Sequence, residues 1–212
     1  MKLAIIAASG NAGKLITKEA LARGFEVVAF VREPAKMSDI KEPNLKVEQR
    51  DILALKSEDL RGFDVIISAY GVVATPQDYE LIYNHLISIL KGNSARFLVV
   101  GGAGSLYMDK ERKIQLIDTP SFPDIYKPVA NAHNKVLSVL RTQDSINWIC
   151  VSPPAEFVLD APKTGKYKII GELFEVNDKG ESKGSYADYA TAIFDILKDS
   201  TINKQRVGVI GL

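Results

Sequence analysis

Small residues at a spacing of three mark the first place where this chain could do chemistry. Ala7, Gly10 and Gly13 belong to the segment AASGNAG, which follows an apolar run and precedes a segment with helical spacing. Small side chains in such a turn let backbone N–H groups approach a pyrophosphate at the amino end of a helix. A position between a first strand and a first helix is the context that a dinucleotide-binding motif requires. The segment therefore predicts a dinucleotide site, with an ordinary tight turn as the alternative; Ala7 stands where glycine is usual.

The residues after the second apolar run, 27–31, bear on which nicotinamide dinucleotide is bound. An arginine at this place pairs with the 2′-phosphate of NADP, whereas a carboxylate accepts a hydrogen bond from the ribose 2′-hydroxyl of NAD. Arg32 follows the run directly and Lys36 lies nearby, which favours NADP(H). Glu33, a carboxylate next to Arg32, favours NAD(H) instead, so NAD(H) remains the alternative cofactor.

The elements that must position these residues are indicated by two kinds of apolar pattern. Short runs rich in Val, Ile and Phe, typical of buried parallel strands, occupy residues 3–7, 27–31, 65–68, 97–100 and 146–151. Between them, helical spacing predicts helices over stripes at 15–21, 79–90 and 129–140. Gly24 is the expected C-terminal cap of the first helix, and Pro128 the first-turn residue of the third. The alternation predicts an α/β fold of Rossmann type, a doubly wound and mostly parallel sheet with helices on both faces.

Two stretches interrupt this alternation. Residues 103–128 carry three prolines and little periodicity, so we expect a long loop. Residues 153–184 read as short strands and turns, and a capping box at Ser185 and Asp188 then opens a last helix before a strand at 206–210. We expect residues 1–212 to form a single NAD(P)-binding domain in which the segments 103–128 and 153–184 cover the substrate.

Composition and charge limit the classes of partner. The 27 basic and 26 acidic residues leave a net charge of +1, which gives no global attraction for nucleic acid or an anionic membrane. No apolar stretch reaches membrane-spanning length and the amino end does not resemble a signal peptide, so a cytoplasmic location is expected. Cys150, the one cysteine, lies in an apolar run and is expected in the core, and no metal site is expected. The pattern predicts no oligomeric state.

Several segments together resemble a known family. They are residues 1–14, 30–36, 68–71, 99–105, 118–120, 126–128, 152–155, 164–167 and 185–190. These segments look like those of atypical short-chain dehydrogenase/reductases, above all the bacterial NAD(P)H-flavin reductases related to biliverdin reductase B and the NmrA-like proteins. The resemblance extends over essentially the whole chain.

The resemblance implies a set of cofactor contacts. Ser9, Gly10, Asn11 and Ala12 would line the diphosphate, and Arg32 would face the adenosine ribose or its phosphate. Asp51 and Ile52 would flank the adenine. Ala69, Tyr70 and Gly71 would lie along the nicotinamide side. Many relatives carry arginine where Asn11 stands, so one phosphate partner of the family pattern is missing here.

The expected chemistry follows partly from what the chain lacks. Typical short-chain dehydrogenases use a Tyr-x-x-x-Lys pair, in which lysine lowers the pKa of the tyrosine. Ala130 stands four residues after Tyr126 in place of the lysine, and neither Tyr186 nor Tyr189 has one at that distance. Hydride transfer to a flavin or quinone depends mainly on positioning, so the missing pair favours such a planar acceptor.

Ser105, Tyr126 and His133 remain as candidate polar groups, of which Ser105 and Tyr126 are the candidate catalytic residues. A surface or partly buried helical residue is the favoured interpretation of His133, and His85 is expected to be structural. The predicted function is an NAD(P)H-dependent oxidoreductase with a flavin, quinone or similar small-molecule acceptor. The alternatives are a non-catalytic, NmrA-like redox sensor and an epimerase-like enzyme acting on a nucleotide-linked sugar.

Overall fold

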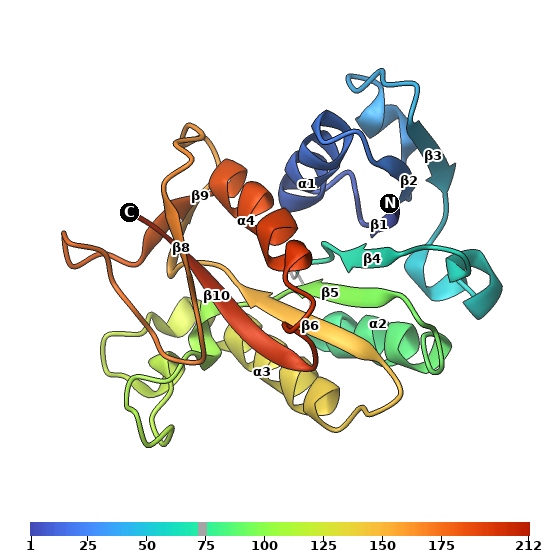
Figure 1. Cartoon of the computed structure of the whole chain (residues 1–212). Helices are drawn as coiled ribbons and strands as arrows, with labels where there is room; N and C mark the ends of the chain where they lie inside the picture. Colours follow the sequence, from blue (N-terminus) through green and yellow to red (C-terminus); the bar gives the residue numbers. More distant parts are fainter. Residues whose placement is uncertain (72–75) are drawn as a thin grey trace.

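A mostly parallel sheet organises the molecule, which is described by a computed structural model over residues 1–71 and 76–212. Within these residues the sheet has eight strands in the order β3-β2-β1-β4-β5-β6-β10-β8, and only β8 runs antiparallel to its neighbour (Figure 1). The strands are β1 (Lys2–Ile6), β2 (Glu26–Val31), β3 (Leu45–Gln49), β4 (Val65–Ser68), β5 (Arg96–Val100), β6 (Asn147–Ser152), β8 (Tyr167–Ile170) and β10 (Gln205–Gly211). A separate parallel pair joins β7 (Glu156–Val158) to β9 (Lys183–Ser185).

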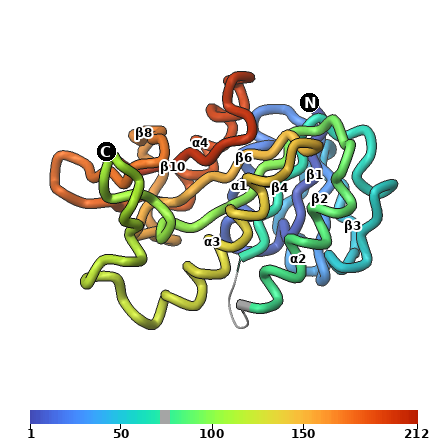
Figure 2. The backbone as a smooth tube through the Cα atoms, turned by 90° about the horizontal axis from the view of Figure 1, so that it is seen from below, coloured from blue at the N-terminus to red at the C-terminus, as the bar shows by residue number. Residues whose placement is uncertain are grey.

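Helices cover both faces of the sheet. α1 (Asn11–Ala22) and α4 (Tyr186–Lys198) lie on one face, and α2 (Pro76–Ile89) and α3 (Lys127–Arg141) lie on the other, as Figures 1 and 2 show. Alternate residues of β1 enter the two resulting cores: Leu3 and Ile5 pack on the α1 side, Ala4 and Ile6 on the α2 side. Strands that are buried on both faces account for the continuous apolar runs of the sequence. The strand order and the helices on both faces confirm the predicted doubly wound Rossmann-type sheet.

Local signals set the ends of the helices. Gly24 adopts a φ of +76°, and its amide donates to the carbonyl of Leu21, which ends α1 as predicted. Pro128 lies in the first turn of α3. The amide of Asp188 donates to the hydroxyl of Ser185 at 3.0 Å, which caps α4. Cys150 is buried in β6 as expected. None of the helices over the described residues has the length and apolarity that a bilayer crossing requires.

The two irregular segments contain only short elements. Three 3₁₀ turns lie in the segment 103–128, namely Ala103–Ser105, Leu116–Asp118 and Asp124–Tyr126, and the short strands β7, β8 and β9 lie in or at the end of the segment 153–184. The other 3₁₀ turns of the described residues are Pro34–Met37, Ile52–Ala54 and Ser57–Leu60. The amide of Tyr107 donates to the carbonyl of Glu172, and that of Phe174 donates to the carbonyl of Tyr107. These bonds join the segment 103–128 to the later segment 153–184.

Candidate functional site

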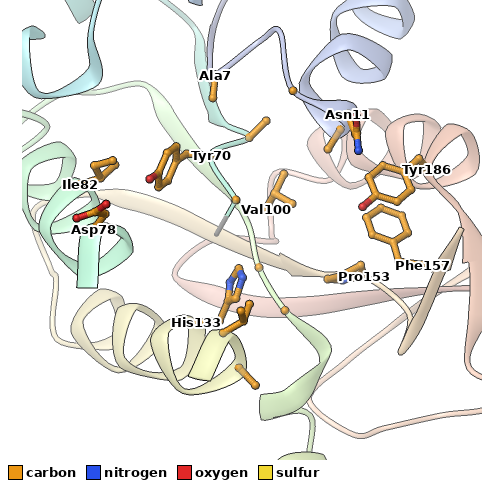
Figure 3. A pocket seen from close by; sticks show the side chains of 18 of the residues that line it. Ala7, Asn11, Tyr70, Asp78, Ile82, Val100, His133, Pro153, Phe157 and Tyr186 are labelled. Atoms are coloured by element: carbon orange, nitrogen blue, oxygen red, sulfur yellow. The ribbon is translucent and has the colours of Figure 1, made fainter. Parts of the chain in front are cut away.

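A large cavity lies beyond the carboxyl ends of the central strands, where strand order reverses between β1 and β4. Its volume is about 1030 Å³, at the upper end of the range usual for ligand pockets. Figure 3 shows side chains from both helix layers around it. We call the lining residues between positions 7 and 53 the charged half, and those between positions 100 and 186 the uncharged half. Residues at the end of β4 and on α2 lie between the two.

The turn from β1 into α1 forms the start of the charged half. The amide of Gly10 donates to the carbonyl of Ala7 at 3.1 Å, and Ala7 itself has a φ of +59°, a conformation in which glycine is favoured. A Cβ atom on Gly13 would lie 2.4 Å from the carbonyl oxygen of Ala7, so helix and strand pack too closely here for any side chain. The first-turn amides of α1 have no intrahelical acceptor, and no acidic residue lies among them. This geometry fits a diphosphate.

Cationic side chains gather at the far end of the charged half. Arg32, Lys36 and Arg50 all line the cavity beyond β2 and β3, together with Asp51 and Ile52. Lys36 pairs with Glu33 at 2.8 Å, and Glu33 does not line the cavity. Arg50 pairs with Asp59 at a longer 3.5 Å. Arg50 was not predicted from the sequence; the usable signal was its place directly before Asp51, which was expected to flank the adenine.

The end of β4 forms the middle of the cavity. Ala69, Tyr70 and Gly71 line it, and the ring of Tyr70 stacks on Tyr79 with ring centres 6.1 Å apart. The hydroxyl of Tyr83 donates to the carbonyl of Tyr70 at 3.2 Å. Burial, and then the charge of Asp78, raise the pKa of Tyr70. This part of the lining is therefore held by aromatic packing from α2.

His133, the third candidate polar group, lines the cavity, although the sequence favoured a surface or partly buried helical residue. Its Nδ1 atom lies 2.8 Å from the hydroxyl oxygen of Tyr79, and Figure 3 shows the ring directed into the cavity. Desolvation lowers the pKa of His133 to about 4, so the imidazole is neutral at pH 7. The missed signal was periodicity, because His133 falls on the same helical stripe as Val129 and Val136. His85 bonds the carbonyl of Leu55 through Nε2 at 3.0 Å and lies outside the lining.

Ser105 is placed away from the cavity. It is buried and absent from the lining, and its hydroxyl accepts a hydrogen bond from Nη1 of Arg206 at 3.2 Å. Arg206, itself buried in β10, also pairs with Glu172, whose carboxylate contacts Arg141 at 2.8 Å. Ser105 thus belongs to a buried cluster that ties the segment 103–128 to the end of the chain, and we do not carry the catalytic hypothesis for it further.

Aromatic and small side chains make up the rest of the uncharged half. Tyr126 lines the cavity with 61% of its surface exposed, and the neighbouring Lys127 pairs with Asp124 at 2.6 Å. Phe157 and Tyr186 also line it, stacked with ring centres 3.5 Å apart and an interplanar angle of 6°. Of the residues predicted to contact the cofactor or to take part in catalysis, all but Ser105 line this one cavity.

Comparisons with known proteins agree with this geometry. A family model described as NAD(P)H-binding matches residues 7–200. The protein YwnB of Bacillus subtilis is 40% identical over 99% of this chain and 98% of its own. The structure of a "putative NADH-flavin reductase" from Streptococcus pneumoniae superposes with a TM-score of 0.91 at 44% identity over the whole of both chains. The structure of a "putative epimerase" from Bacteroides thetaiotaomicron superposes with a TM-score of 0.90 at 33% identity, over 100% of this chain and 97% of that chain.

Proposed function

Because the chain belongs to the NAD(P)H-binding family, we propose that it is an NADPH-dependent reductase whose acceptor is a flavin, a quinone or a similar planar compound. The observation that carries the proposal is the division of the cavity. A phosphate-binding turn and a cationic cluster line the cavity beyond β1, β2 and β3, whereas aromatic and small residues without formal charge line it beyond β5 and β6 and on α3. The Streptococcus pneumoniae relative, described as a "putative NADH-flavin reductase", supports the same type of acceptor.

We propose that the charged half holds the dinucleotide. Ser9, Gly10, Asn11 and Ala12 would bind the diphosphate through first-turn amides and small side chains. Arg32, supported by Lys36 and Arg50, would hold a 2′-phosphate, which favours NADP(H) over NAD(H). Asp51 and Ile52 would flank the adenine, and Ala69, Tyr70 and Gly71 would lie along the nicotinamide side. When bound, the reduced nicotinamide supplies a hydride, which is two electrons and one proton.

We propose that the uncharged half holds the acceptor between the segments 103–128 and 153–184, with residues 1–212 acting as one domain. The acceptor gains the hydride and takes a further proton from water, so that NADPH, acceptor and one proton give NADP⁺ and the two-electron-reduced acceptor. Neutral His133 orients the acceptor by a hydrogen bond through Nε2, because Nδ1 is engaged by Tyr79. The hydroxyl of Tyr126, at the open edge, provides a second polar contact.

The test is oxidation of NADPH by the purified chain with riboflavin, FMN and a naphthoquinone, compared with NADPH alone. We expect acceptor-dependent turnover, with NADPH used more efficiently than NADH. Tight NADPH binding without turnover on any of these acceptors would refute the reductase and favour the redox sensor. An epimerase would give the same negative result in this assay, and interconversion of a nucleotide-linked sugar without net loss of reduced cofactor would distinguish it from the sensor.

A further inference from the structure

Charge is distributed unevenly around the cavity. Its positive side chains, Arg32, Lys36 and Arg50, all belong to the charged half, beyond β2 and the edge strand β3. Among the described lining residues between positions 100 and 186 there is no Asp, Glu, Lys or Arg. His133, which lies in this half, is neutral because desolvation lowers its pKa to about 4. The uncharged half therefore carries no formal charge at neutral pH.

Three cations on or beside the elements that form the uncharged half are engaged elsewhere. Lys127, one residue from the lining residue Tyr126, pairs with Asp124 at 2.6 Å and does not line the cavity. Arg141 and the buried Arg206 both bind the carboxylate of Glu172. Asp78 of α2, which lines the middle of the cavity, is an anion and repels a phosphate.

An anionic group has nothing to offset its desolvation in this half. Removing a phosphate or sulfonate from water without a counter-ion is strongly unfavourable, whereas an uncharged ring system gains from contact with apolar and aromatic side chains. The stacked pair Phe157 and Tyr186, together with Phe122 and Pro153, supplies such contacts.

We infer that the acceptor is an uncharged planar aromatic compound, such as a flavin without phosphate or an unsubstituted quinone, and that phosphorylated flavins are selected against. This inference rests on the proposed reductase function and narrows its acceptor class. Discrimination comes from the absence of a cation in the uncharged half, not from the shape of the ring system.

Two matched pairs of acceptors test the inference: riboflavin against FMN, and a naphthoquinone against its sulfonated analogue. Within each pair the ring system is the same and only the anion differs. We expect kcat/KM with NADPH to be higher for the uncharged member by about tenfold or more. Dissociation constants measured in the presence of NADP⁺, where no turnover occurs, should show the same order. Equal values, or preference for the anionic members, would overturn the inference; no turnover with any of the four would instead refute the proposed function.

A substitution in the lining sharpens the test. Ser121 is an exposed lining residue of the uncharged half, so a longer side chain can be accommodated there. Ser121→Lys adds a cation, and Ser121→Gln adds a polar chain without charge. In the lysine variant we expect the ratio of FMN to riboflavin kcat/KM to rise at least about fivefold, with a smaller gain at high salt. In the glutamine variant the ratio should stay at its original value. An unchanged ratio in the lysine variant, or the same rise in both, would contradict the inference.

Discussion

The two halves of the cavity are built in different ways. The charged half depends on backbone geometry at the ends of neighbouring strands: a left-handed residue at Ala7, close helix packing at Gly13 and cations directly after β2 and β3. The uncharged half depends on two irregular segments that are held in place by the buried cluster of Arg206, Glu172 and Ser105. We therefore expect nucleotide binding to depend on the sheet and its turns, and the choice of the proposed acceptor to depend on the segments attached to it. Substitutions should separate the two.

The largest effect should follow from breaking the buried cluster. Glu172→Ala leaves the guanidinium of Arg206, which is fully buried, without its carboxylate partner. We expect the free energy of unfolding, measured by urea denaturation, to fall by about 3–5 kcal/mol. The KM for the acceptor should rise, while NADPH binding by the folded fraction should change little. Glu175→Ala, which breaks an exposed ion pair with Lys168 in the same segment, is the matched control and should cost less than about 1 kcal/mol. Equal losses in the two variants would contradict a structural role for the cluster.

A methyl group at Gly13 should disturb the charged half instead. In Gly13→Ala the new Cβ would lie 2.4 Å from the carbonyl oxygen of Ala7 and 2.8 Å from Cα of Ala8, so α1 must shift away from β1. We expect a loss of about 1–3 kcal/mol in unfolding free energy and at least a tenfold weaker affinity for NADPH by fluorescence titration. Gly10→Ala is the control for stability, because its Cβ would meet the same oxygen only at 3.4 Å. Similar stability losses in both variants would refute the close-packing argument.

The cofactor preference should depend on charge at one position. Arg32→Met removes a cation that lines the cavity directly after β2. A hydrogen bond to a charged group contributes about 1.5–3 kcal/mol, so the KM for NADPH should rise by about 10–100-fold, while the KM for NADH stays the same. Arg61→Met removes an exposed arginine outside the cavity and should change neither value. Parallel increases for both cofactors would show that Arg32 does not distinguish the 2′-phosphate.

His133, in the uncharged half, should make the stability of the protein depend on pH. Its pKa is about 4 in the folded chain and 6.5 without burial, so the unfolded chain binds more protons between these values. Stability should therefore fall as pH decreases from 6.5 to 4 and then show no further change from this residue. His133→Phe should remove this component from the urea-denaturation profile and lower acceptor kcat/KM about tenfold. Tyr79→Phe keeps the desolvated imidazole and should keep the pH-dependent component. Loss of that component in Tyr79→Phe would assign the effect to another group.

The sequence predicted the sheet and the charged half better than the uncharged half. Strands buried on both faces and a glycine turn leave local patterns in the sequence, so they could be predicted without knowledge of the fold. β3 was missed because Leu45–Gln49 is a half-exposed edge strand without a continuous apolar run. Ser105 was misjudged because its partner, Arg206, is 101 residues away. Contacts of that separation are fixed by tertiary packing and leave no pattern near either residue.

The smallest effect is expected at Ala7, the position where the turn departs from the usual glycine. Its φ of +59° strains an alanine by about 1 kcal/mol, and Ala7→Gly relieves that strain while giving the unfolded chain more conformational freedom. These two contributions nearly cancel, so the free energy of unfolding should stay within about 0.5 kcal/mol of its original value, with NADPH affinity retained. Ala8→Gly is the matched control, because Ala8 is buried with a negative φ and nothing offsets its loss of about 1 kcal/mol. If Ala7→Gly were as destabilising as Ala8→Gly, the backbone at Ala7 would not be strained, and the charged half would tolerate alanine without a conformational cost.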